Sequence, residues 1–201
     1  MFHRLFFVFS WLVLFALAFS AAEPEAVKRD LPRLKPTESA DALATFTVKS
    51  GFRIELTAAE PFVTDPVAMA FDENSRLFIV EMIGYSEHRD DRLGQVRLLE
   101  DENGDGRYDR STIYARDLAW PTAIVCHDGG VFIGATPDIL FLKDTDGDQK
   151  ADERRVIFTG IGDGVNRLNM QSLMNSFRWG HDNRIHGTAS GTPGKVRVVG
   201  K

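Results

Sequence analysis

Residues 122–152 read TAIVCHDGGVFIGATPDILFLKDTDGDQKAD. Three short, mainly apolar runs lie in this stretch, at 122–126, 131–134 and 139–142. The turn Asp128-Gly129-Gly130 separates the first two runs, and an acidic loop at 144–152 follows the third. Runs of this length, bounded by Asp and Gly, are typical of β-strands joined by tight turns. The stretch therefore predicts an antiparallel meander that ends in an acidic loop.

The same order of features occurs on both sides of this stretch. Strand-like second runs begin at Leu77, Val131 and Ile185, which are 54 residues apart in each case. Acidic loops begin at Asp101 and Asp144, 43 residues apart. The other expected strands lie at 67–71, 95–99, 113–115, 156–158, 176–179 and 195–199. The repeating unit is four short strands, with one acidic loop between the third and the fourth.

Four-stranded units that repeat about every 40–55 residues are typical of a β-propeller. A β-sandwich is the alternative, but it does not require the same turn and loop to recur at a fixed interval. The prediction is an all-β fold, with about three four-stranded antiparallel blades of a six-bladed propeller at residues 45–201. Because a propeller needs about four blades or more, we expect the remaining blades elsewhere in a longer protein.

The two acidic loops predict calcium binding. Side-chain oxygens at positions 1, 3, 5 and 9 of such a loop, with the backbone carbonyl of position 7, can converge on one Ca²⁺ ion. The ligands predicted by this spacing are Asp101, Asn103, Asp105, Arg107 and Asp109, and Asp144, Asp146, Asp148, Lys150 and Asp152. Asp/Gly hairpin turns are the alternative for either loop. The second copy favours calcium, in a structural role.

The N-terminal residues predict export. Residues 1–22 have a short basic start, an apolar core and small residues for cleavage between residues 20 and 22, as in a signal peptide. An uncleaved membrane anchor is the alternative, but about 20 apolar residues are usually needed to cross a bilayer, and this run is shorter. Residues 23–44 are rich in Pro, Glu, Lys and Ala, which predicts a flexible leader.

The net charge and the cysteine content argue against a nucleic-acid-binding protein and against an internal disulfide bond. The formal net charge of −5 argues against a nucleic-acid partner. The single cysteine, Cys126, has no second cysteine in the chain for a disulfide bond, and its apolar flanks predict a buried thiol.

Several motifs together resemble a known family. They are the runs 52–61, 65–72 and 77–82, the segment Pro137-Asp138-Ile139-Leu140, and Phe177-Arg178-Trp179-Gly180 with the following residues 182–187. Together they are similar to the N-terminal propeller of membrane-bound dehydrogenases of planctomycete and verrucomicrobial bacteria. That family resembles quinoprotein glucose and sorbosone dehydrogenases, which are six-bladed propellers.

The resemblance implies pyrroloquinoline quinone (PQQ) and Ca²⁺ as cofactors, and a sugar or alcohol hydroxyl as the substrate. Members of the family often carry a haem on a Cys-x-x-Cys-His motif. Cys126 is the only cysteine here, so a haem is expected only in a downstream or partner cytochrome c module.

One residue departs from the resemblance. Relatives carry a catalytic His eight residues before the Gly of the Trp-Gly turn, and this chain has Ser172 there. Serine without a base does not take up a proton near neutral pH, so no catalytic residue is assigned. Ser172, Asn175, Arg178 and His186 are the candidate substrate-binding residues. The chain is therefore expected to be either a dehydrogenase module or a non-catalytic propeller that binds carbohydrate or a protein partner.

Overall fold

The computed structural model of the chain describes residues 34–163, 168–189, 191 and 193–200. The expected signal peptide lies outside these residues. The end of the expected leader forms one helical turn, α2 (Ser39–Ala42), followed by the 3-10 turn η1 (Leu43–Thr45). In the described part of the chain, no helix has the length and apolar character needed to span a membrane.

The first sheet is an antiparallel meander in chain order. It contains β1 (Pro66–Phe71), β2 (Leu77–Glu81), β3 (Gly94–Glu100) and β4 (Arg110–Leu118). The predicted four-stranded unit is confirmed here, although β4 is longer than the run at 113–115 that indicated it. The first acidic loop joins β3 to β4, as expected.

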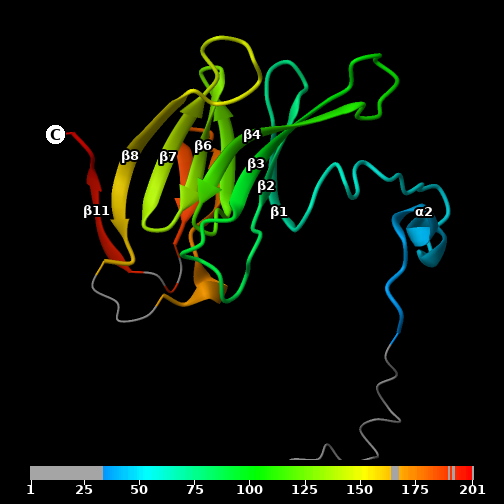
Figure 1. Cartoon of the computed structure of the whole chain (residues 1–201), viewed down its shortest axis with the longest axis horizontal. Coiled ribbons are helices and arrows are strands. Elements are labelled where there is room, and N and C mark those ends of the chain that lie inside the picture. The colour runs from blue at the N-terminus through cyan, green and yellow to red at the C-terminus, as the bar shows by residue number, and fades with distance from the viewer. Residues whose placement is uncertain (1–33, 164–167, 190, 192, 201) are drawn as a thin grey trace, which may run out of the picture. The chain divides into compact units, whose positions relative to one another are not determined.

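The second sheet repeats this arrangement and adds one strand. It contains β5 (Ala123–His127), β6 (Gly130–Ala135), β7 (Asp138–Lys143) and β8 (Glu153–Ile161), in the order of the chain. The fifth strand, β11 (Gly194–Val198), pairs antiparallel with the free edge of β8 (Figure 1). The all-β class with antiparallel sheets is therefore confirmed, and no described sheet closes on itself.

The third unit differs from the prediction. The strands β9 (Asn175–Trp179) and β10 (Ile185–Thr188) form a two-stranded hairpin, and β11 joins β8 instead of β10. The pairing depends on two glycines, because a Cβ atom on Gly194 would lie 2.1 Å from the carbonyl oxygen of Gly160. Only residues without side chains allow the two backbones to approach so closely.

The main core lies between the first two sheets. It is formed by the buried side chains Phe78, Val80, Val96, Leu98, Tyr114, Leu118, Ile124, Val131, Ile133, Ala135, Leu140 and Leu142. The strands that open each unit are also neighbours, since β1 contacts β5 and β5 contacts β9. The first strands of three separate units therefore lie next to one another.

Candidate functional site

A cavity of about 450 Å³ lies where the three opening strands begin. Its wall combines polar and apolar side chains: Asp65, Pro66, Val67, Met82, Tyr85, Thr122, Met170, Gln171, Leu173 and Asn175. These residues come from the start of β1, the end of β2, the start of β5, the turn η2 (Met170–Ser172) and the start of β9. A concave site with a few polar groups on an apolar wall is the usual form of a small-molecule site.

Hydrogen bonds within and between the units hold the wall together. The amide of Met82 donates to the carbonyl of Asp65 at 3.1 Å, which joins the end of β2 to the start of β1. The hydroxyl of Thr122 donates to the carbonyl of Met174, which joins β5 to the segment before β9. Met82, Trp120 and Leu173 form a small buried cluster beside the cavity.

Two of the four predicted substrate residues lie at or beside this cavity. Asn175 lines it, and its side-chain oxygen accepts a hydrogen bond from the hydroxyl of Thr188 at 2.9 Å. Ser172 is in the turn η2 next to Gln171, and its hydroxyl accepts from the side-chain amide of Asn169 at 3.1 Å.

The other two predicted residues lie elsewhere. Arg178 on β9 and His186 on β10 are directly opposite each other in the hairpin and are exposed. The His186 ring is 3.0 Å from the carboxylate of Asp182, and this hydrogen bond lowers the pKa of Asp182 below its usual value. Neither Arg178 nor His186 lines the cavity, so the four residues do not form one site.

Asp65, Tyr85 and Thr122 are among the cavity residues that were not predicted as candidates. Asp65 begins one of the motifs that carry the family resemblance, so its position was visible in the sequence. Tyr85 follows the end of β2, and Thr122 precedes β5. The three residues share one feature: each lies near a strand end, on the side of the sheets where the opening strands begin. Only the pairing of the strands shows that these ends lie on the same side.

The second acidic loop brings three carboxylates together. The carboxylate oxygens of Asp144, Asp146 and Asp152, at positions 1, 3 and 9, lie within 4.8 Å of one another. Asp152 also accepts the side-chain hydroxyl and the backbone amide of Thr145, and these hydrogen bonds lower its pKa. Asp148 is not part of this group; its carboxylate accepts from the amide of Lys150 at 2.8 Å.

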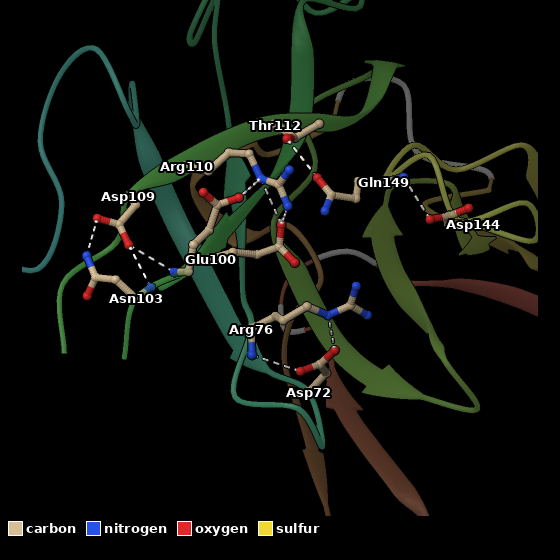
Figure 2. Close-up of polar contacts among 10 residues, drawn as sticks. Asp72, Arg76, Glu100, Asn103, Asp109, Arg110, Thr112, Asp144 and Gln149 are labelled. Carbon is tan, nitrogen blue, oxygen red and sulfur yellow. Dashed lines mark hydrogen bonds and ion pairs between the residues drawn. The ribbon is translucent and has the colours of Figure 1, made fainter. Parts of the chain in front are cut away.

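The first loop has the same backbone hydrogen bonds as the second, but its side chains make different contacts with one another. In both loops the first Asp accepts the amides of positions 4 and 6: Gly104 and Gly106 donate to Asp101, and Gly147 and Gln149 donate to Asp144. In the first loop, however, the side-chain NH₂ of Asn103 donates to Asp109 at 3.0 Å (Figure 2). A donor therefore occupies the position where a cation would need an acceptor.

The predicted ligands Asp105 and Arg107 are bonded to each other in the first loop. Asp105 accepts the backbone amide of Arg107 at 2.8 Å. Beside this loop lies a cavity of about 540 Å³, with Arg76 and Tyr108 on its wall. Asp72 holds the guanidinium of Arg76 at 2.7 Å, as Figure 2 shows.

The second loop is anchored to the neighbouring sheet. The amide of Asp144 donates to the hydroxyl of Tyr114 at 3.0 Å, and the amide of Ala151 donates to the carbonyl of Tyr114 at 2.8 Å. Figure 2 also shows the hydroxyl of Thr112 directed at the side-chain oxygen of Gln149, at 3.3 Å. The loop therefore forms part of the junction between β4 and the second sheet.

The comparisons with known proteins give one match. A family model with the description Domain of unknown function (DUF7133) matches residues 38–201. No curated protein and no solved structure gives a significant match. Because the matched residues include all eleven described strands and most of the chain, the chain belongs to the DUF7133 family.

Proposed function

We propose that this chain is an exported, calcium-stabilised β-propeller module that binds a hydroxylated small molecule, of the carbohydrate class, in the cavity at the start of β1, β5 and β9. The observation that carries the proposal is this cavity, to which three successive repeat units each contribute the beginning of their first strand.

The arrangement of the opening strands supports the propeller. In a propeller the first strand of each blade lies nearest the central axis, so these strands are neighbours while the sheets extend outward. The contacts of β1 with β5 and of β5 with β9 agree with this order. The pairing of β11 with β8 departs from it, since a radial blade would place β11 beside β10. The remaining blades are the proposed partner of this module.

The donor set of the second loop fits a hard cation. Ca²⁺ takes oxygen ligands, and Asp144, Asp146 and Asp152 offer carboxylates at short mutual distance. A bound Ca²⁺ ion would offset two of the three crowded negative charges at the junction with Tyr114. We propose the first loop as a weaker site, because its centre is closed by the bond from Asn103 to Asp109.

The cavity wall suits a neutral ligand with several hydroxyl groups. The side chains of Thr122, Gln171 and Asn175 offer hydrogen-bond donors and acceptors, while Val67, Met82 and Leu173 offer apolar surface. Sugars present both kinds of surface to a protein. Tyr85 is half exposed at the rim and lies 5.8 Å from Trp120, measured between ring centres.

The second candidate is the dehydrogenase that the resemblance implies. The position of the cavity favours it, because a substrate hydroxyl at the centre of a quinoprotein-like propeller would lie at this end of the opening strands. PQQ, if bound, would supply a two-electron acceptor. The described wall fits PQQ poorly: the quinone carries three carboxylates, and the wall has no Lys or Arg and no His.

One experiment separates the two candidates. We would titrate the purified full chain with glucose and other neutral monosaccharides by calorimetry, and compare Asn175→Ala with the control Asn74→Ala, which alters an exposed turn residue. Binding that Asn175→Ala weakens by about tenfold, with Asn74→Ala unchanged, supports the binding module. Absence of binding to the unaltered chain contradicts it.

The same preparation then receives PQQ, Ca²⁺ and an electron-accepting dye. Sugar-dependent reduction of the dye would establish the dehydrogenase. Sugar binding without dye reduction would leave the binding module as the function.

A further inference from the structure

A second cavity lies between the first two sheets, away from the sugar-binding wall. Its volume is about 230 Å³. Three arginines line it: Arg89 and Arg92 from the connection between β2 and β3, and Arg154 from β8. None of these residues belongs to the proposed sugar or calcium sites, so the cavity requires its own explanation.

Backbone carbonyls hold the three guanidinium groups in place. Arg89 Nη2 donates to the carbonyl of Thr136 at 2.6 Å. Arg92 donates to the carbonyl of Asp117 through Nε at 3.0 Å and Nη2 at 2.8 Å. Arg154 donates to the carbonyls of Arg116 at 3.0 Å and Asp117 at 3.1 Å. The carbonyl groups are neutral acceptors. They orient the guanidinium groups but do not balance their positive charge.

Two of these charges crowd each other. Arg92 and Arg154 share the carbonyl of Asp117 as acceptor. Partial burial lowers the pKa of Arg154 below its usual value and the charge of Arg92 lowers it further, while the carboxylate of Asp117 acts in the opposite direction. A guanidinium has five N–H donors, and within the described residues Arg92 Nη1 makes no hydrogen bond. The cavity therefore combines an N–H donor that has no acceptor among the described residues with two neighbouring positive charges.

The carboxylates on the same wall do not match this charge. Asp90 lies 3.4 Å from Arg89, but its side chain is 96% exposed, where water screens the pair. Asp138 accepts the hydroxyl of Thr159 at 2.6 Å. The wall itself carries three arginines and two aspartates, and the carboxylate of Asp117, outside the wall, also acts on Arg154.

We propose that this cavity binds a small tetrahedral oxyanion of the phosphate or sulfate class, held between Arg92 and Arg154 with Arg89 beside them. Planar guanidinium groups bind such anions through paired N–H bonds. An anion there would also remove the repulsion between the two guanidinium groups. The ligand is either the free ion or an ester of it, because the two present the same charged oxygens.

Thermal unfolding of the purified full chain tests this at constant ionic strength, with chloride replaced stepwise by phosphate or sulfate. The unaltered chain is expected to show a saturable rise in Tm. Arg154→Gln and Arg92→Gln should each weaken the apparent affinity by about tenfold or more, and Arg154→Lys by less. Arg110→Gln is the control, since Arg110 pairs with Glu100 outside this cavity. Circular dichroism confirms that each variant folds.

The outcomes decide the proposal. If the arginines only tie loops together, Arg92→Gln and Arg154→Gln lower the Tm equally with and without phosphate, and the proposal is wrong. A Tm that does not respond to phosphate or sulfate in the unaltered chain also overturns it. A parallel titration with methyl phosphate, an ester without a sugar, distinguishes the sources: tighter binding than for inorganic phosphate identifies an ester as the ligand, and equal or weaker binding identifies the free ion.

Discussion

Glu81 is the most deeply buried charge in the described part of the chain. Its side chain is inaccessible to water, and its carboxylate accepts the amide of Thr64 at 2.6 Å, the side chain of Gln95 at 2.5 Å and Arg97 Nε at 3.1 Å. The network ties the segment before β1 to β2 and β3. The burial of Glu81 and its three hydrogen-bond partners assign it a structural role.

We therefore expect Glu81→Gln to destabilise the fold strongly. The substitution leaves the guanidinium of Arg97, which is only 17% exposed, without its ion-pair partner. Breaking one side of a buried ion pair costs about 3–5 kcal/mol. Urea unfolding measures the loss. The control is Glu55→Gln, which removes the exposed pair with Arg53 and should cost less than about 1 kcal/mol. Equal losses for the two variants would contradict the structural role.

Cys126 should be almost unreactive in the folded chain. Burial raises the pKa of its thiol to about 12. A raised pKa favours the neutral thiol in the folded state, so this stabilisation is complete below the unfolded value of about 8.5 and is lost as the pH rises towards 12. At pH 8, Ellman's reagent should react with the folded chain about a thousandfold more slowly than with the chain in urea.

Cys126→Ser provides the blank for this measurement, since the chain has no other cysteine. A native thiol that reacts as fast as the unfolded one would show that the strand around Cys126 opens readily.

At the scale of elements, the two acidic loops share their backbone hydrogen bonds, but we expect calcium to bind mainly at the second loop. Ca²⁺ at about ten times its Kd should raise the Tm of the full chain by about 4 °C. Asp146→Asn should remove most of this rise, because Asp146 belongs to the three-carboxylate group. Asp128→Asn is a matched control, since Asp128 is an exposed aspartate in a turn of the same sheet. An equal calcium response in both variants would mean that the ion does not bind at the second loop.

Strand positions could be predicted because local signals determine them. Each expected strand run overlaps an observed strand, and turns such as Asp128-Gly129-Gly130 lie between the paired strands. The partner of β11 could not be predicted in this way. Its residues indicate a strand, but its pairing depends on the close approach of Gly194 and Gly160, which are far apart in the sequence.

The same distinction applies to the sites. Regular spacing within one loop was sufficient to indicate Asp144, Asp146 and Asp152. The cavity at Asn175 and the arginine cavity each combine residues from several units, so only the packing of the sheets reveals them. Arg178 and His186 were selected from the hairpin sequence alone, and the strand register places them opposite each other on an exposed surface.

At the scale of the whole molecule, β1 presents an apolar row to solvent. Its alternate residues Ala68 and Ala70 pack against the main core, while Val67, Met69 and Phe71 are 50%, 64% and 57% exposed. Contiguous apolar surface of this kind marks a contact with another protein surface. In a propeller, this face of the sheet would be covered by another blade.

The purified full chain should therefore associate with itself in a concentration-dependent way, through this row. Replacing Met69 and Phe71 by Glu should shift the molar mass measured by light scattering towards the monomer, because charged side chains resist burial against a second apolar face. Leu34→Glu is the control: Leu34 is 87% exposed and lies outside the sheets. A monomer at all concentrations before any substitution would show that the row needs no partner, which would remove an important reason to expect further blades.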